Sequence, residues 1–244
     1  MKLDVRKFQL FNLLVALLLS YSYFSWSRIG ASVLMYFLML AVGINMGLHR
    51  GFSHGRLEPD SFFGRICLFF SVLTCMGRPS SWILVHRLHH IYSDTNLDPH
   101  SPTKSGRWQV FTNTWSLSKE IPANAILAIK TSIRKSSAIL FFDRNYWTII
   151  GLYCGALLIF GGVGMLVYAW CIPATGALLA TSLVNAFCHD PKGNILNVKW
   201  ISLMTFGEGF HKYHHLNPNS NRTNQSAVLD FSGWLLTRFL KGPI

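Results

Sequence analysis

Histidines recur along this chain at spacings that suit metal binding. Imidazole is the commonest side chain that binds iron, zinc, copper and nickel in proteins. One isolated histidine would usually be incidental, but three clusters in one chain indicate a metal centre. The clusters are one HxxxxH pair and two HxxHH triplets, joined by a histidine that follows an asparagine by four positions: His49 and His54; His86, His89 and His90; His211, His214 and His215; and Asn185 with His189.

The spacing within each cluster predicts how it would present its imidazoles. In a helix, His86 shares a face with His89 and His90, which lie three and four positions later. Adjacent histidines point about 100° apart, so each HH pair could serve two neighbouring metal ions. His49 and His54 are five residues apart, which places them well apart around an ideal helix. We therefore expect the helix to end or distort between them, where Gly51 lies.

The tenth histidine and the five cysteines carry no such pattern. His100 lies in the turn-like stretch from Asp98 to Pro102, and we interpret it as a loop histidine without a metal role. The cysteines stand in apolar surroundings without CxxC spacing. Buried thiols behave as small apolar groups, so we expect reduced packing residues and no disulfide framework.

Apolar stretches must position the histidines, and they indicate a membrane protein. Half of the residues are apolar and only 13% are charged, a balance that is unusual for a soluble domain. A spanning helix needs about 20 apolar residues, with a lower limit near 17. Four stretches are predicted to span the membrane, and Gly161 to Gly164 would form a tight turn between the last two. They cover residues 8–24, 30–48, 146–160 and 164–188.

A fifth apolar run, from Phe62 to Met76, is shorter and interrupted by Arg65. We expect a buried or interfacial helix there rather than a span. This assignment matters, because a fifth span would separate the flanking histidines onto opposite faces of the membrane.

The four-span topology gives a consistent charge distribution. It places both termini, residues 49–145 and residues 189–244 on one side, together with every Lys and Arg except Arg28. Such an excess marks the cytoplasmic side. The first stretch is predicted to remain as a span, because Ser20 to Tyr23 offers no small-x-small site for signal cleavage.

The sequence therefore predicts a single domain, residues 1–244: an all-α integral membrane protein with four transmembrane helices and a cytoplasmic helical cap that carries the histidine site. The formal charge of +12 raises the alternative of nucleic-acid binding. We exclude nucleic acid as a partner, because no compact Lys/Arg cluster is interleaved with aromatic residues and the basic residues alternate with apolar spans.

The order of these motifs between paired apolar stretches resembles the membrane fatty acid desaturases, in particular the stearoyl-CoA desaturase-like branch. GINMGLHRGFSH (residues 43–54) is similar to the first histidine box of that branch. HRLHHIYSDTNLDPH (86–100) is similar to the second box and GEGFHKYHH (207–215) to the third. NAFCH (185–189) resembles its additional metal-binding segment. Together the matches cover most of the chain in the same order.

This resemblance implies a di-iron enzyme that uses O2 to introduce a cis double bond, most often at delta-9, into a fatty acyl chain. It implies a separate electron donor, cytochrome b5 or a ferredoxin, since no HPGG haem motif occurs here. Asn185 would contact one iron through water. The implied iron ligands are His49, His54, His86, His89, His90, His189, His211, His214 and His215.

One segment departs from the branch. Animal acyl-CoA enzymes carry an Arg-Asp pair before the second box, where this chain has Trp82-Ile83-Leu84-Val85. That context is more similar to bacterial and cyanobacterial acyl-lipid desaturases, so the acyl carrier stays open between CoA and a membrane lipid. Three nearby cations could still hold a phosphate, although we interpret them as solvated charges: Lys104, Arg107 and Lys119.

Two alternatives to a desaturase also stay open. One is a related membrane di-iron hydroxylase that oxidises a lipid. The other is a metal transporter or sensor without enzymatic activity. A transporter should carry polar groups inside its spans, and the few candidates here, Asn45 and Asn185, lie near the predicted cytoplasmic ends.

Overall fold

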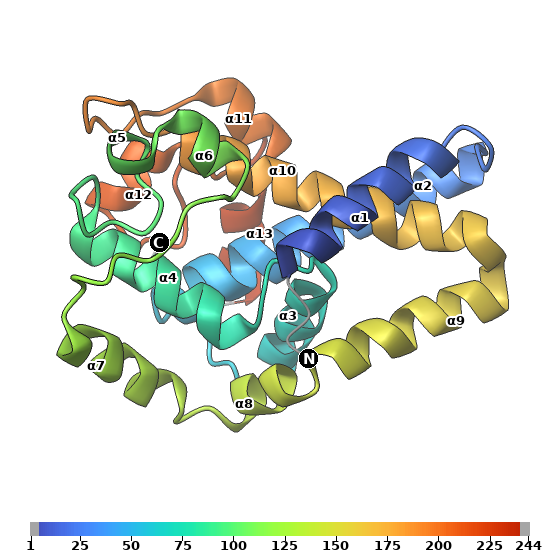
Figure 1. The fold of residues 1–244 in the computed structure, drawn as a ribbon, viewed down its shortest axis with the longest axis horizontal. Helices are drawn as coiled ribbons and strands as arrows, with labels where there is room; N and C mark the ends of the chain where they lie inside the picture. The colour runs from blue at the N-terminus through green and yellow to red at the C-terminus, as the bar shows by residue number, and fades with distance from the viewer. Residues whose placement is uncertain (1–4, 240–244) are drawn as a thin grey trace.

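The computed structural model describes residues 5–239, and its regular elements are all helical. Four long helical segments project to one side of a cap built from shorter helices and loops (Figure 1). The predicted all-α class is therefore confirmed.

The first projecting hairpin pairs α1 (Val5–Leu19) with α2 (Trp26–Phe37), which continues without a break into the π-helical segment η1 (Leu38–Ser53). Ser25 caps α2 by accepting a hydrogen bond from the Arg28 amide. Because α1 already ends at Leu19, the last residues of the predicted stretch 8–24 form the turn between the two helices.

The second hairpin comprises α9 (Tyr146–Leu166), the short π-helical η2 (Val167–Cys171) and α10 (Ile172–Phe187). The chain reverses at Gly162, whose φ of 67° lies in the left-handed region that favours glycine. This break falls between the predicted stretches 146–160 and 164–188, as the glycine-rich sequence indicates.

The turns of the two hairpins meet at the end farthest from the cap (Figure 1). The Arg28 guanidinium lies against Gly164, within 2.7 Å of the position where a Cβ would stand. The Tyr168 hydroxyl donates to the carbonyl of Ser20 at 2.7 Å. Both short loops of the predicted topology thus share one end of the molecule.

Among the described residues, two helical stretches are long and apolar enough to cross a membrane, Trp26–Ser53 and Tyr146–Phe187, and the second contains the reversal at Gly162. Helix α1 has 15 residues, fewer than the roughly 17 that a span needs. The count of four spans stays a prediction.

The apolar run after the first histidine pair forms α3 (Phe62–Leu73), which has 12 residues. It packs along η1, and the two backbones touch at Gly43, where an added Cβ would lie 2.6 Å from the Ser71 amide nitrogen. Since Cys67, Leu68 and Val72 are fully buried, α3 is a packed helix, in agreement with the prediction that this run does not span.

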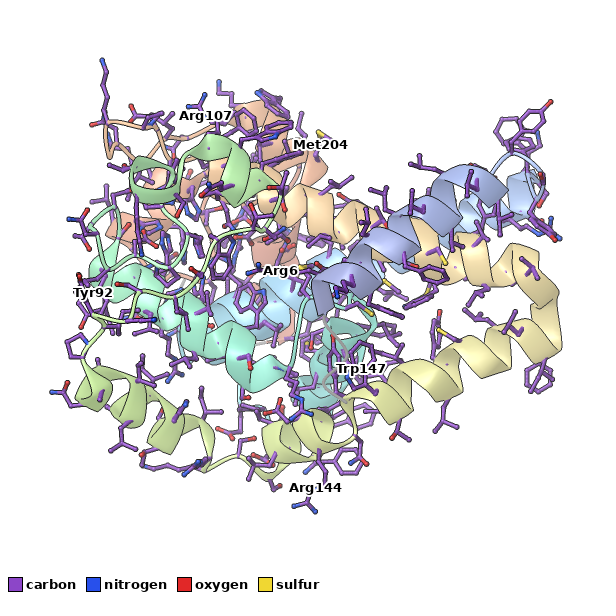
Figure 2. All side chains as sticks on the ribbon, in the orientation of Figure 1. Arg6, Tyr92, Arg107, Arg144, Trp147 and Met204 are labelled. Carbon is purple, nitrogen blue, oxygen red and sulfur yellow. The ribbon has the colours of Figure 1, made fainter. Side chains whose placement is uncertain are left out.

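The cap contains the remaining helices. Helix α4 carries the second histidine cluster and α12 carries the third. At the outer edges of the cap, Arg107 and Arg144 are exposed (Figure 2). The cap helices are α4 (Pro79–Tyr92), α5 (Pro102–Ser105), α6 (Arg107–Phe111), α7 (Ala123–Ile133), α8 (Ser137–Arg144), α11 (Lys199–Met204), α12 (His211–Leu216) and α13 (Phe231–Phe239).

Candidate metal centre

The fold brings all nine histidines of the sequence motifs together in two adjacent groups. Within each group, the nitrogens that could bind an ion lie within 4.8 Å of one another. The rings of His90 and His215 stack at 4.3 Å between centroids, so the two groups touch. The first group contains His49, His54, His86, His90 and His214, and the second contains His89, His189, His211 and His215.

Helical geometry divides each HxxHH triplet between the groups. On α4, His86 and His90 face the first group and His89 the second. On α12, His214 faces the first group while His211 and His215 face the second. Adjacent histidines therefore serve different groups, as their separation of about 100° requires.

The first pair is aligned by the π-helix. In the π-helix η1 the backbone hydrogen bonds join residues five positions apart, the spacing of His49 and His54, whose ring centroids lie 5.5 Å apart. The expected distortion takes the form of this wider helix. Gly51 is required there, because an added Cβ would collide with the Met46 carbonyl oxygen.

Within each group, the Nε2 atoms of different histidines point toward one another. In the first group His49 and His214 approach to 2.8 Å, and His54 and His86 to 2.9 Å. In the second, His89 and His215 lie 3.2 Å apart. Two nitrogens that each lie about 2.1 Å from one ion are about 3 Å apart when they subtend a right angle at it. The spacing therefore fits shared coordination of a cation.

Three carboxylates, which we did not single out from the sequence, fix the orientation of the rings. His49 Nδ1 donates to Glu208 at 2.6 Å, His89 Nδ1 to Asp98 at 2.9 Å, and His189 Nδ1 to Asp94 at 2.8 Å. With Nδ1 protonated, the Nε2 lone pair faces the group. Carboxylates that bind metal-ligating histidines in this way set the tautomer and raise the basicity of the ligand.

Burial favours the neutral form of seven of these imidazoles, those of His54 and of the two HxxHH triplets. It lowers the pKa of His54, His90 and His215 to about 2 in each case, with neighbouring histidines adding to the effect. The pKa values of the remaining α4 and α12 histidines are also well below the usual value for the same reason. A neutral imidazole is the form that binds a metal ion.

Two buried polar features indicate that a cation belongs here. His189 Nε2 points into the second group and has no hydrogen-bond partner. The side chain of Asp98 is fully buried, and its donors are His89 Nδ1 and the amides of Asp94 and His100. Burial raises the pKa of Asp98 to about 6. A positive charge among the adjacent imidazoles would offset the cost of this buried carboxylate, and an all-imidazole donor set suits iron.

A cavity of about 270 Å³ adjoins the first group along His86. Arg6 and Gln9 line it where α1 begins (Figure 2), while Met76, Val85 and Leu178 contribute apolar walls. A smaller space of about 40 Å³ continues along Leu40 and Ile44 of η1. Both spaces share four lining residues, Trp82, His86, Thr181 and Asn185.

Trp82 and Asn185 mark the place where this cavity meets the histidines. The Trp82 ring stacks on His86, with centroids 5.1 Å apart and planes 16° apart. Asn185 lies in the last turn of α10, four residues before His189, and lines both spaces next to the histidines. Its predicted contact with iron through water stays a prediction.

His100 is closer to the centre than its sequence context indicated. It does lie in a loop, but only 5% of its surface is exposed and its ring stacks on His89 at 4.4 Å. It also lines the larger cavity. The loop folds over the second group because the amides of Asp94 and His100 both donate to the carboxylate of Asp98.

The three orienting carboxylates had a signal in the sequence. Asp94 and Asp98 belong to the segment that follows the second histidine box, and Glu208 to the one that precedes the third. Arg50, in contrast, directly follows His49 but had no recognisable role until the fold placed it beside Glu208, at 3.0 Å, and Asp230, at 2.7 Å.

Comparison with known proteins agrees with this geometry. The family model for fatty acid desaturases matches residues 24–230. The sn-1 stearoyl-lipid 9-desaturase of Anabaena variabilis is 29% identical over 202 residues, which cover 80% of this chain and 73% of that protein. The delta-9 acyl-lipid desaturase 2 of Arabidopsis thaliana is 27% identical over an aligned length of 256, and the alignment covers 98% of this chain and 80% of the relative. The chain therefore belongs to the fatty acid desaturase family.

Proposed function

We propose that this protein is an O2-dependent desaturase that introduces a cis double bond into a saturated fatty acyl chain at two iron ions held by nine histidines. The convergence of nine imidazoles in two adjacent groups, beside a partly apolar cavity, carries the proposal. No amino-acid side chain is a strong enough oxidant to break an unactivated C–H bond. Iron bound in these groups would supply that chemistry by activating O2, which is reduced to water.

The residues of the chain hold the substrate and orient the ligands. Met76, Val85 and Leu178 would bind the acyl chain and exclude water from the cavity. The Trp82 ring, stacked on His86, would fix where the chain passes the first histidine group. Glu208 holds the Nδ1 proton of His49, and Asp98 that of His89, so both rings keep their Nε2 atoms toward the centre.

The double-bond position and the acyl carrier follow from the relatives and from the cavity wall. We propose delta-9 desaturation of a membrane lipid, because the relatives from Anabaena and Arabidopsis described above bear the names of stearoyl-lipid and acyl-lipid 9-desaturases. An acyl-CoA 5-desaturase of Anemone leveillei is similar at 27% identity, so CoA is the alternative carrier. Val85, next to His86, presents an apolar side chain to the cavity instead of a charge that could bind CoA.

We also propose that both hairpins span the membrane, giving four spans with the histidine cap in the cytoplasm. The two hairpin turns lie together at the end away from the cap, and within residues 5–239 every Lys and Arg except Arg28 belongs to the cap side. A separate cytoplasmic donor, cytochrome b5 or a ferredoxin, would deliver the electrons, and the basic cap would favour an acidic one.

Expression in a desaturase-deficient host, followed by analysis of fatty acids in separated lipid classes, tests this function. We expect new monounsaturated chains with the double bond at delta-9, first in membrane lipids, and none from the His86→Ala variant. New hydroxylated chains without new unsaturation would replace the desaturase by a lipid hydroxylase. Unsaturation that appears first in acyl-CoA would overturn the proposed carrier alone.

A further inference from the structure

The two histidine groups have different electrostatic surroundings. In the second group, two carboxylates accept hydrogen bonds from ligand histidines: Asp98 from His89 and Asp94 from His189. The first group has one such carboxylate, Glu208, which accepts from His49. The second group, with four histidines against five, therefore has more negative charge directly behind its ligands.

Nearby arginines increase the difference. Glu208 forms an ion pair with Arg50, which is fully buried and also pairs with Asp230. A second guanidinium, that of Arg87, donates to the carbonyls of Phe52 and Ser53, just before His54. The negative charge beside the first group is thus compensated by positive charge within the protein.

The aspartates of the second group lack such compensation. Among residues 5–239 the ion pairs that Asp94 and Asp98 form are with histidines. Their other donors are neutral, as in the Ser101 hydroxyl that donates to Asp94 and the amides that donate to Asp98. The nearest lysine contact is Lys104 Nζ, 3.5 Å from the backbone carbonyl of Asp98, on an exposed side chain.

We propose that the two metal positions are unequal: the four-histidine position binds a divalent cation more tightly and fills first, because Asp94 and Asp98 act there as positioning residues with uncompensated charge. The side chain of Asp98 is fully buried and that of Asp94 is 9% exposed, so water screens their attraction for a cation weakly. In the five-histidine position, the positive charges of Arg50 and Arg87 together offset the negative charges of Glu208 and Asp230. This inference rests on the proposed two-metal centre.

Anaerobic titration of the metal-free protein with Fe2+, measured by calorimetry, tests the order of filling. The wild type should bind two equivalents in two resolved steps. Asp94→Asn and Asp98→Asn each keep an oxygen that can accept the hydrogen bond from the histidine Nδ1–H, but they remove the negative charge. Each variant should weaken the tighter binding step about 10- to 100-fold. Glu208→Gln should weaken only the looser step. Thermal unfolding of each metal-free variant checks that it is folded.

Asp190→Asn is the matched control. It removes the same charge next to His189 in sequence, but this carboxylate accepts only within its own turn, from Lys192 and Asn194, and both steps should be unchanged. The inference is overturned if Glu208→Gln weakens the tighter step, if both aspartate variants leave that step intact, or if the wild type fills both positions in one step. A wild type that binds fewer than two equivalents would instead contradict the proposed two-metal centre.

Discussion

The projecting hairpins expose large apolar side chains, whereas the cap buries polar ones. On α9 the large apolar residues face outward, with Leu152 70% exposed and Phe160 88% exposed. In the cap the interior is polar, and His89, His214 and Asp98 are among its most buried residues. An apolar exterior is stable only in apolar surroundings, and a buried cluster of imidazoles and carboxylates needs a cation. The exposed apolar surface of the hairpins is suited to contact with lipid, and the buried histidines of the cap are suited to holding a metal ion.

The largest expected effect comes from removing a ligand of the cap. His86→Ala and His214→Ala each delete one of five nitrogens in the first group. We expect desaturation to fall by at least about a hundredfold, since even the partners that orient metal ligands are worth 10- to 100-fold. The measurement is the yield of monounsaturated chains per amount of protein. Tyr213→Phe is the control and should retain activity, because Tyr213 directly precedes His214 on α12 but its side chain is exposed.

Acid should weaken the cap and spare the hairpins. Burial lowers the pKa of His54, His90 and His215 to about 2, so these groups stay neutral in the folded protein while the unfolded chain takes up protons below about pH 6.5. Stability is therefore lost as the pH falls through that value, by roughly 1.4 kcal/mol per histidine at pH 5.5.

Thermal unfolding of the metal-free protein between pH 7.5 and pH 5.5 measures this loss. A pH-independent unfolding temperature would contradict the neutral, buried state of the histidines.

The polar interior also depends on Arg50, which joins the first histidine group to the loop before α13. Arg50→Ala leaves Glu208 and Asp230 buried without their cation, and we expect a loss of about 3–5 kcal/mol in the free energy of unfolding. Arg65→Ala breaks an ion pair with Asp60 on a side chain that is 48% exposed, where the loss should be at most about 1 kcal/mol. Chemical unfolding measures both losses. If Arg50→Ala and Arg65→Ala lowered the free energy of unfolding equally, the buried ion pairs would contribute no more to stability than the exposed one.

The smallest effect tests the hairpin reversal. Gly162→Ala places a Cβ on a residue with a φ of 67° and a ψ of −170°, a region that is essentially restricted to glycine, which costs about 1–3 kcal/mol. At Gly155, inside α9, an added Cβ meets no atom within 4 Å, so Gly155→Ala should be neutral or slightly stabilising. Unfolding temperatures of the two variants in the same detergent decide between a true turn and a continuous helix.

The hairpins were the more predictable region, because their pattern is local. Apolar run lengths and the glycines around Gly162 were enough to locate α9, α10 and their reversal within a few residues. The π-helical form of η1 was not foreseen, since only the five-residue spacing of His49 and His54 indicated a distortion.

In the cap, spacing identified eight of the histidines and indicated that each HH pair is divided between two groups, because helical geometry separates adjacent residues. His189 was identified through the resemblance of residues 185–189 to a metal-binding segment of the desaturases. The partners of these histidines were harder to find. Asp94, Asp98 and Glu208 are brought to the histidines by loops, and Asp230 reaches Arg50 from 180 residues away. His100 lies in a loop, as predicted, but its burial against His89 was not foreseen, because the Asp98 hydrogen bonds fold this loop inward. That it has no metal role stays a prediction. Such long-range contacts leave no periodic pattern in the sequence.

The most direct test of the two-group centre is the iron content of purified, active protein, measured together with activity after reconstitution with Fe2+ and a reductant. The activity measurement matters because overexpressed protein can take up zinc adventitiously. We predict two iron ions per chain in active protein, with desaturation rising only as the second ion binds. His214→Ala should lose the activity and the iron of the five-histidine group. Full activity in His214→Ala, or full activity at one iron per chain or none, would contradict the account.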